Sequence, residues 1–320
     1  SAPDNAMPAT LQDYFRWDPD AKCLRSDKDL IDAGLLIRDK DGKQPDFHIL
    51  HLPKAYEDGT STFKAALGHH AWDKQEAEIC RLLSQSGRTD NSIGERESIT
   101  ADHRAQLSGS VLRNFPRPPR QDNDAPLHLA AIFSTFLAGA RARGLEFGSR
   151  TDFARTMFCS NADFERTTFS GGDANFNRAE FSGGRASFDA AQFTGGSVNF
   201  DFAGFVGGIA NFNRAEFSRG HTRFNHAKFS GGDACFNRAE FSGGHTSFDH
   251  AKFSGGDASF NHTKFSGDGA SFLRAEFSKG EVSFGGTEFI AGYARFDYAN
   301  FSGGNVDFNA ARFSNGRPAL

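Results

Sequence analysis

Histidine is the residue type in this chain best suited to acid–base or metal chemistry, and it recurs at fixed intervals. His226 and His250 lie 24 residues apart. His221 and His245 have the same separation. If the chain forms coils of that length, each pair would be about 4.8 Å apart and could hold a metal ion. Solvated outward positions copied by duplication explain the same spacing, and we prefer that interpretation and expect no metal.

A second group of histidines precedes the repetitive part of the chain. His48-x-x-His51 and His69-His70-x-x-Asp73 are loose metal-like spacings, but no third strong element accompanies them. Structural or surface histidines are therefore the preferred interpretation. The chain also has no Walker loop, no Gly-x-Gly-x-x-Gly between a strand and a helix, and no Gly-x-Ser-x-Gly elbow. We expect no catalytic residue and no cofactor.

The cysteines have no metal or redox spacing, which indicates reduced, cytosolic thiols. The four are isolated and far apart: Cys23, Cys80, Cys159 and Cys235. Cys235 occupies a position where the neighbouring repeats have Asn211 and Ser259. A small surface residue explains it better than a nucleophile.

The charge balance excludes several classes of partner. The chain has 40 acidic and 36 basic residues, so no global field attracts it to nucleic acid or to an anionic membrane. No stretch of 18 apolar residues occurs, and no basic-then-apolar leader follows Met7. We expect a cytoplasmic protein without direct nucleic-acid or membrane binding.

The 36 phenylalanines reveal a repeat. From Phe176 onward their spacing alternates between five and seven residues, so the unit has twelve residues. Most of these phenylalanines follow a small residue, usually Ala, by two positions. Residues two apart point to the same side of a strand, so Ala and Phe point inward and the polar residue between them points outward. Gly-Gly pairs such as Gly183-Gly184 turn the corners.

A second period doubles the first. Residues 209–232 and 233–256 match at 19 of 24 positions, whereas successive twelve-residue units differ from each other. A coil of 24 residues places like on like and encloses four phenylalanines, which predicts a four-sided coil. Duplication of a two-unit block would produce the same alternation. The predicted core includes Phe176, Phe181, Phe212, Phe217, Phe236, Phe241, Phe260 and Phe265.

The same register predicts stacked pairs on the outer surface, which form the candidate interaction surface. Besides the two histidine pairs, Lys228 should lie over Lys252. On the opposite side, the pairs are Arg214 with Arg238 and Glu216 with Glu240. Solvated rows of a duplicated repeat are again the simpler explanation.

Tandem Ala-x-Phe-x-x units, with 28 phenylalanines in register, resemble the pentapeptide repeat family. The resemblance covers about half of the chain. It implies a right-handed quadrilateral β-helix in which Phe is the central inward residue and Ala is the small one. The sequence departs from the family pattern at every second step, where seven residues replace five.

The fold class expected is mainly β: a right-handed parallel β-solenoid preceded by a smaller α or α+β region. Residues 1–6 precede Met7 and are interpreted as an expression scar. Residues 7–120 form the N-terminal region, and residues 121–146 a linker that begins or caps the solenoid. The solenoid itself is expected over 147–317.

The N-terminal region carries ordinary local signals. Leu35 to Arg38 and Phe47 to Leu52, separated by Asp41-Gly42, predict a hairpin. Amphipathic patterns predict helices at His70–Ser86 and Thr100–Phe115. Residues 127–144 fit either a capping helix or an irregular first coil, and the first coil is slightly preferred.

Three functions remain open at this point. The first is a non-catalytic scaffold that presents rigid faces to a partner protein. The second follows from the resemblance, because some pentapeptide-repeat proteins resemble duplex DNA and bind DNA gyrase. That function needs an acidic face, whereas units 173–316 carry 15 acidic and 13 basic residues. The third is an enzyme with an unrecognised N-terminal active site. An open C-terminal coil would also favour a homodimer.

Overall fold

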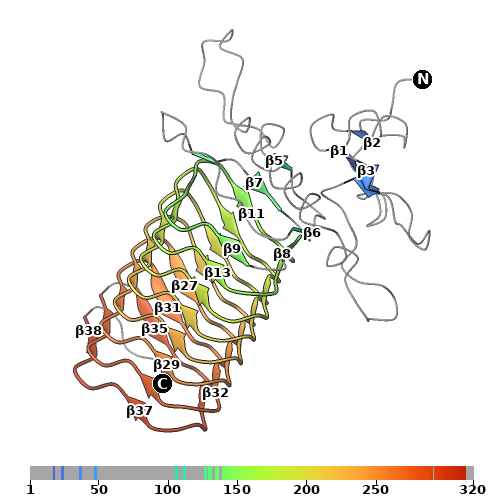
Figure 1. Ribbon diagram of the computed structural model, residues 1–320. Helices are drawn as coiled ribbons and strands as arrows, with labels where there is room; N and C mark the ends of the chain where they lie inside the picture. The colour runs from blue at the N-terminus through green and yellow to red at the C-terminus, as the bar shows by residue number, and fades with distance from the viewer. Residues whose placement is uncertain are drawn as a thin grey trace, which may run out of the picture.

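The structure is a computed structural model. It describes residues 17–18, 23–24, 36–37, 47–48, 105–106, 111–112, 126–127, 129–131, 134–136, 139–290 and 292–314. From residue 105 onward the described chain winds into a parallel β-solenoid with four sheets (Figure 1). The described residues contain no helix, and hence none with the length and apolarity to cross a membrane.

Two of the sheets contain nine strands each. The first sheet consists of β5 (Ala105–Gln106), β7 (Leu129–Ala130), β11 (Thr151–Asp152), β15 (Ala174–Asn175), β19 (Val198–Asn199), β23 (Thr222–Arg223), β27 (His245–Ser247), β31 (Gly269–Ser271) and β35 (Tyr293–Arg295). The second sheet consists of β6 (Val111–Leu112), β8 (Thr135–Phe136), β12 (Met157–Phe158), β16 (Glu180–Phe181), β20 (Gly204–Phe205), β24 (Lys228–Phe229), β28 (Lys252–Phe253), β32 (Glu276–Phe277) and β36 (Asn300–Phe301).

The other two sheets contain eight strands each. The third sheet consists of β9 (Ala140–Arg141), β13 (Ala162–Asp163), β17 (Ala186–Ser187), β21 (Ala210–Asn211), β25 (Ala234–Cys235), β29 (Ala258–Ser259), β33 (Val282–Ser283) and β37 (Val306–Asp307). The fourth sheet consists of β10 (Glu146–Phe147), β14 (Thr168–Phe169), β18 (Gln192–Phe193), β22 (Glu216–Phe217), β26 (Glu240–Phe241), β30 (Lys264–Phe265), β34 (Glu288–Phe289) and β38 (Arg312–Phe313).

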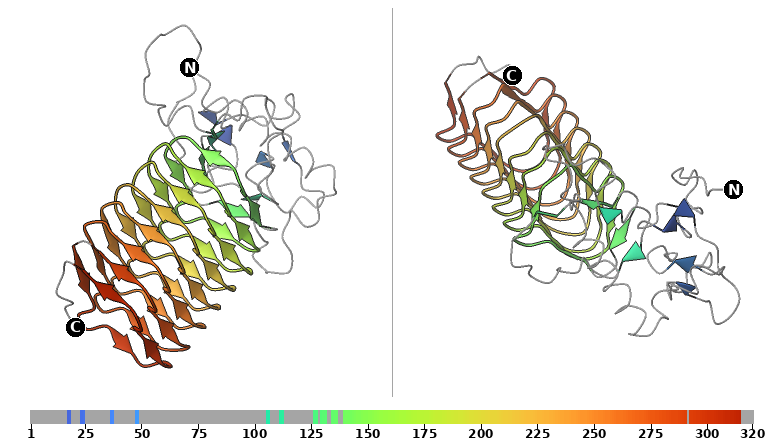
Figure 2. Two further views of the ribbon diagram at one scale, coloured as in Figure 1. Left: turned by 90° about the vertical axis from the view of Figure 1, so that its left-hand side faces the viewer. Right: turned by 90° about the horizontal axis from the view of Figure 1, so that it is seen from above.

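The chain visits the four sheets in turn, so each strand pairs with the strand four places later (Figure 2). From β13 onward the pairing offset is 24 residues, as in Phe181↔Phe205. The earlier coils are shorter: Phe136 pairs with Phe158, and Phe158 pairs with Phe181. The predicted four-sided coil of 24 residues is confirmed.

The coil alternates between two-residue strands and tight turns. In one half-coil, Ala210 and Phe212 point inward and are buried, and Phe212 O accepts the Ala215 N–H at 3.2 Å to close a turn. The third residue of that turn, Arg214, has a φ of 57°. A left-handed third residue defines a type II turn, which normally favours glycine. Thirteen described non-glycine residues have a positive φ, and they recur at this turn position around the solenoid.

Phenylalanine fills the interior. All eight predicted core phenylalanines are at most 2 % exposed. Along the axis their rings stack, as in Phe188–Phe212 with centroids 4.8 Å apart and an interplanar angle of 2°. Across the interior they meet edge to face, as in Phe212–Phe224 at 5.3 Å and 88°. Both arrangements are favourable for aromatic quadrupoles, so each ring is stabilised in two directions.

The N-terminal predictions have mixed outcomes. The hairpin is confirmed, because β3 (Leu36–Ile37) pairs antiparallel with β4 (Phe47–His48). A second antiparallel pair joins β1 (Trp17–Asp18) to β2 (Cys23–Leu24). The predicted helix at 70–86 lies outside the described residues.

The helix predicted for residues 100–115 is wrong at β5 and β6, which pair parallel with β7 and β8. Strands β7 to β9 likewise make 127–144 a coil and not a capping helix. The cause is tertiary, because stacking on the next coil supplies the backbone partners that an isolated amphipathic segment would find in a helix. Solenoid strands therefore occur before residue 147.

Replacing a ring in the middle of a stack should destabilise the fold strongly. We expect Phe212→Ala to lower the free energy of unfolding by about 3–5 kcal/mol, measured by urea denaturation, because it leaves a cavity between two stacked neighbours. Phe313→Ala is the matched control, since Phe313 is partly exposed and stacks on Phe289 in the last described coil. Equal losses in the two variants would contradict this account of the core.

Removing a side chain from a left-handed turn position should not destabilise the fold. Ala190 has a φ of 54°, and Gly286 already occupies the equivalent turn position. A left-handed L-residue costs about 1–2 kcal/mol, whereas glycine costs roughly 0.5–1 kcal/mol in backbone entropy. Ala190→Gly should therefore leave the melting temperature unchanged or raise it. The adjacent Ala191→Gly, at a buried position without positive φ, should lower it.

Candidate functional site

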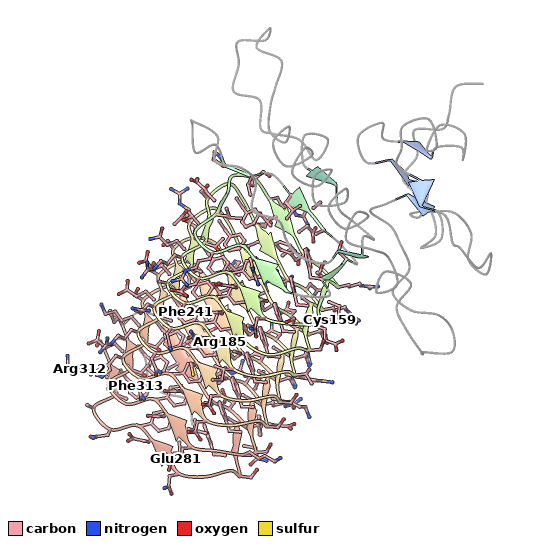
Figure 3. All side chains as sticks on the ribbon, in the orientation of Figure 1. Cys159, Arg185, Phe241, Glu281, Arg312 and Phe313 are labelled. Carbon is pink, nitrogen blue, oxygen red and sulfur yellow. The ribbon has the colours of Figure 1, made fainter. Side chains whose placement is uncertain are left out.

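The outer surface is organised in columns, because outward residues repeat at the coil offset (Figure 3). Lys228 pairs with Lys252 on the second sheet, and Glu216 pairs with Glu240 on the fourth. These are two of the stacks that the sequence predicted. Further along the same columns the sign changes, since Lys252 contacts Glu276 at 3.0 Å and Lys264 contacts Glu240 at 3.2 Å.

The edge between the first and second sheets carries a column of planar side chains. We call it the aromatic column; its members are Arg178, Phe202, His226, His250, Arg274 and Tyr298, all with positive φ. His226 stacks on Phe202 at 4.7 Å and on His250 at 4.7 Å, as predicted for the histidine pair. The Arg178 guanidinium lies 4.9 Å from the centroid of the Phe202 ring. Cation–π and stacking contacts hold these exposed side chains in place.

The other predicted histidine pair has a structural contact. The His245 backbone N–H donates to His221 Nδ1 at 2.9 Å. His245 Nδ1 lies 3.0 Å from Gly269 O, and the Tyr293 ring lies 5.4 Å from the His245 ring. Within the described part of the chain, no three His, Cys, Asp or Glu side chains are grouped as they would be around a metal ion. Of the N-terminal candidates His51, His69, His70 and Asp73, none lies in the described residues.

A groove of about 670 Å³ runs along the third sheet and its edge with the fourth sheet. It extends over six successive coils and contains Arg214 and Arg238, the remaining predicted pair. The floor is low because the outward residues of the third sheet are short. They are Ser187, Asn211, Cys235, Ser259 and Ser283.

Asparagine side chains bond successive coils along this groove. Asn213 Oδ1 accepts the Asn237 N–H at 2.8 Å, and Asn237 Oδ1 accepts the Asn261 N–H at 2.9 Å. Asn261 Oδ1 accepts the Gly285 N–H, also at 2.9 Å. The turns cannot use the strand ladder, so these amides satisfy the backbone N–H groups at the corners. The groove therefore has a rigid polar wall.

The cations of the groove differ in their pairing. Arg214 is bidentate to Asp189, with nitrogen–oxygen distances of 2.5 and 3.0 Å. This hydrogen bond raises the pKa of Arg214 further above its ordinary value. Arg185, Arg238 and His262 also contribute to the lining and are exposed, and no ion pair involves them among the described residues. The groove thus presents unsatisfied positive charge beside amide groups.

The edge between the second and third sheets is acidic. Asp233, Asp257 and Glu281 follow one another along it. Asp233 Oδ1 accepts the Asp257 N–H at 3.0 Å, and Asp257 Oδ1 accepts the Glu281 N–H at 2.8 Å. The two aspartates therefore have a structural role. The third sheet lies between this acidic edge and the basic groove wall.

Cys235 lies at the predicted position between Asn211 and Ser259. It is a free thiol and half-buried. Burial, followed by the negative charge of Asp233, raises the pKa of the Cys235 thiol above its ordinary value. A protonated thiol is a poor nucleophile, so the interpretation as a small surface residue holds.

Sequence reasoning found the stacked pairs but not the groove. The signal was present: rows of 24 residues align the short outward residues of the third sheet in one column. Whether such a column forms a groove depends on the height of the neighbouring edges, which the register alone does not give.

Comparison of the chain with protein-family models, with curated proteins and with solved structures finds no match in any of the three. The geometry of the solenoid is therefore the basis for the functional proposal.

The thiol of Cys235 should react only at alkaline pH. A raised pKa moves the thiolate fraction to higher pH, so alkylation of Cys235 in the folded protein should begin at higher pH than in urea. Timed iodoacetamide labelling followed by peptide mass spectrometry resolves this cysteine from the others. Faster labelling of the folded protein at neutral pH would contradict the assignment.

Proposed function

We propose that this protein is a non-catalytic scaffold of the pentapeptide-repeat type, which binds a partner protein in the groove along the third sheet. The repeat supports the family assignment, since Ala and Phe occupy the small and central inward positions of each half-coil. The seven-residue steps coincide with the corners that contain the Gly-Gly pairs, as in Gly207-Gly208 before β21. They lengthen two corners of the coil and keep the inward positions in register.

The groove is the observation that carries the proposal. It is open along its length and extends over six coils, which suits an extended segment better than a compact small molecule. Arg238 and His262 follow each other along one wall, with Arg185 nearer one end. Guanidinium groups bind carboxylates in charge-assisted hydrogen bonds. The segment that fits this lining is an extended acidic one.

The rigidity of the solenoid supports the same function. Every coil is bonded to its neighbours through four sheets, and its outward side chains are at fixed positions. A preformed groove loses little conformational entropy when a partner binds. A scaffold of this kind needs no reactive group, in agreement with the protonated Cys235 thiol.

Mimicry of duplex DNA toward DNA gyrase has weaker support. That function requires a continuous acidic face. On the fourth sheet the column Glu216, Glu240, Lys264 and Glu288 is interrupted by a lysine. The acidic edge at Asp233, Asp257 and Glu281 extends over only three coils. A gyrase supercoiling assay, in which we expect no inhibition, tests this alternative directly.

Charge reversal in the groove should abolish binding of an acidic segment. We expect a fluorescein-labelled peptide of alternating Glu and Ser to bind, with an affinity that falls as salt is raised. Arg238→Glu should weaken this binding about tenfold or more, the equivalent of ~1.4 kcal/mol, in a fluorescence anisotropy titration.

Arg219→Glu is the matched control for that titration, because Arg219 is exposed but lies outside the groove. It should leave the affinity within a factor of two to three of the starting protein. Equal binding of a Lys-Ser peptide, or equal losses in both variants, would overturn the proposed groove function.

A further inference from the structure

One strand position of the second sheet lacks the side chain that its neighbours have. Gly204 of β20 pairs with Glu180 on one side and Lys228 on the other. Its φ is not positive, and a Cβ there would have its nearest contact at 3.4 Å, with Val206 Cγ2. The backbone therefore does not require glycine, and glycine weakens a strand. The missing side chain leaves a notch in the face of the sheet.

A projecting aromatic ring lies beside this notch. Phe202 precedes Gly204 by two residues, has a φ of 59° and is 49 % exposed. Arg178 and His226 cover the two faces of its ring, so only the ring edge is free to contact another molecule. Val206, at 48 % exposure, forms the far side of the notch. One coil thus carries a knob and a hole side by side.

We propose that two copies of this chain associate side by side through this edge, with Phe202 of each copy inserted above Gly204 of the other. A knob and a hole at the same height can satisfy each other twice only around a two-fold axis parallel to the solenoid axis. In that arrangement the aromatic column of one copy faces the second-sheet column of the other, coil by coil.

The charges along the two columns agree with this register. Arg178 faces Glu180, which has no ion pair among the described residues of its own chain. Two further oppositely charged residues, Arg274 and Glu276, face each other three and four coils away from that end. Charge complementarity of this kind fixes the register of an interface.

The remaining members of the strip are compatible with the same register. His226 and His250 face Lys228 and Lys252, a contact that neutral imidazoles tolerate as hydrogen-bond acceptors. Tyr298 faces Asn300 at the last described coil. The strip therefore extends over six coils, roughly 29 Å at strand spacing. Nothing in it requires a charge to be buried without a partner of opposite sign or an acceptor.

The acidic-peptide groove remains free in this dimer. The coil visits the sheets in order, so the edge between the first and second sheets is diagonally opposite the edge between the third and fourth. Two grooves would then face away from each other on a single rigid particle. Such a particle would engage a partner with two binding segments with increased avidity.

Filling the notch should separate the copies. We expect the full chain to sediment as a dimer in a concentration series, and Gly204→Lys to raise the dimer dissociation constant at least tenfold. The neighbouring coils carry Lys228 and Lys252 at the same position, so the variant should fold and melt like the parent. Gln192→Lys on the fourth sheet is the matched control and should remain dimeric.

Exchanging charges identifies the occupant of the strip as a second copy. Glu180→Arg should weaken the dimer, and the double variant Arg178→Glu with Glu180→Arg should restore it, since each copy then carries both halves of the swapped pair. A foreign partner would not be rescued in this way.

Three results would overturn the proposal. The first is a monomer at the highest soluble concentration. The second is a dimer that Gly204→Lys leaves intact, which would indicate end-to-end association through the C-terminal coil. The third is rescue of Glu180→Lys by Lys228→Glu instead, which would indicate an antiparallel pair.

Discussion

The structure depends on one coincidence of distances: stacked phenylalanine rings and paired β-strands repeat at nearly the same interval. The rings of Phe193 and Phe217 are 4.8 Å apart, which is the spacing of hydrogen-bonded strands. Each added coil therefore extends the backbone ladder and the aromatic columns together. A coil of different length would break both, which explains why the offset holds at 24 residues from β13 onward. Only the first coils, next to Phe136 and Phe158, use shorter offsets.

The same constraint determines the surface. Outward side chains form columns whether or not contact between them is favourable, so each column needs its own means of tolerating close neighbours. Some alternate in sign, as Lys252 and Glu276 do. Others place a side-chain oxygen under the backbone N–H of the next coil, as the asparagines of the groove do. The aromatic column stacks planar groups, and its members retain a positive φ that costs free energy at each turn.

These columns give the solenoid two distinct edges. The groove edge combines amides with unpaired cations and suits an extended acidic segment. The diagonally opposite edge combines Phe202 with the notch at Gly204 and suits a second copy. Because the walls between them are rigid, the two edges hold a constant separation. A dimer through one edge would present two grooves outward, which is a geometry suited to joining partner molecules and not to transforming them.

The sequence by itself determined what depends on period. Alternation along a strand decides which residues point inward, so the core and stacked pairs such as Lys228 with Lys252 could be predicted. The hairpin of β3 and β4 followed from an equally local signal. Only the tertiary structure decided what depends on neighbours in other coils. Residues 105–106 and 111–112 form strands because the next coil supplies their hydrogen-bond partners, whereas their pattern alone fits a helix. The groove and the notch arise from the relative heights of side chains on adjacent sheets, which no single period encodes.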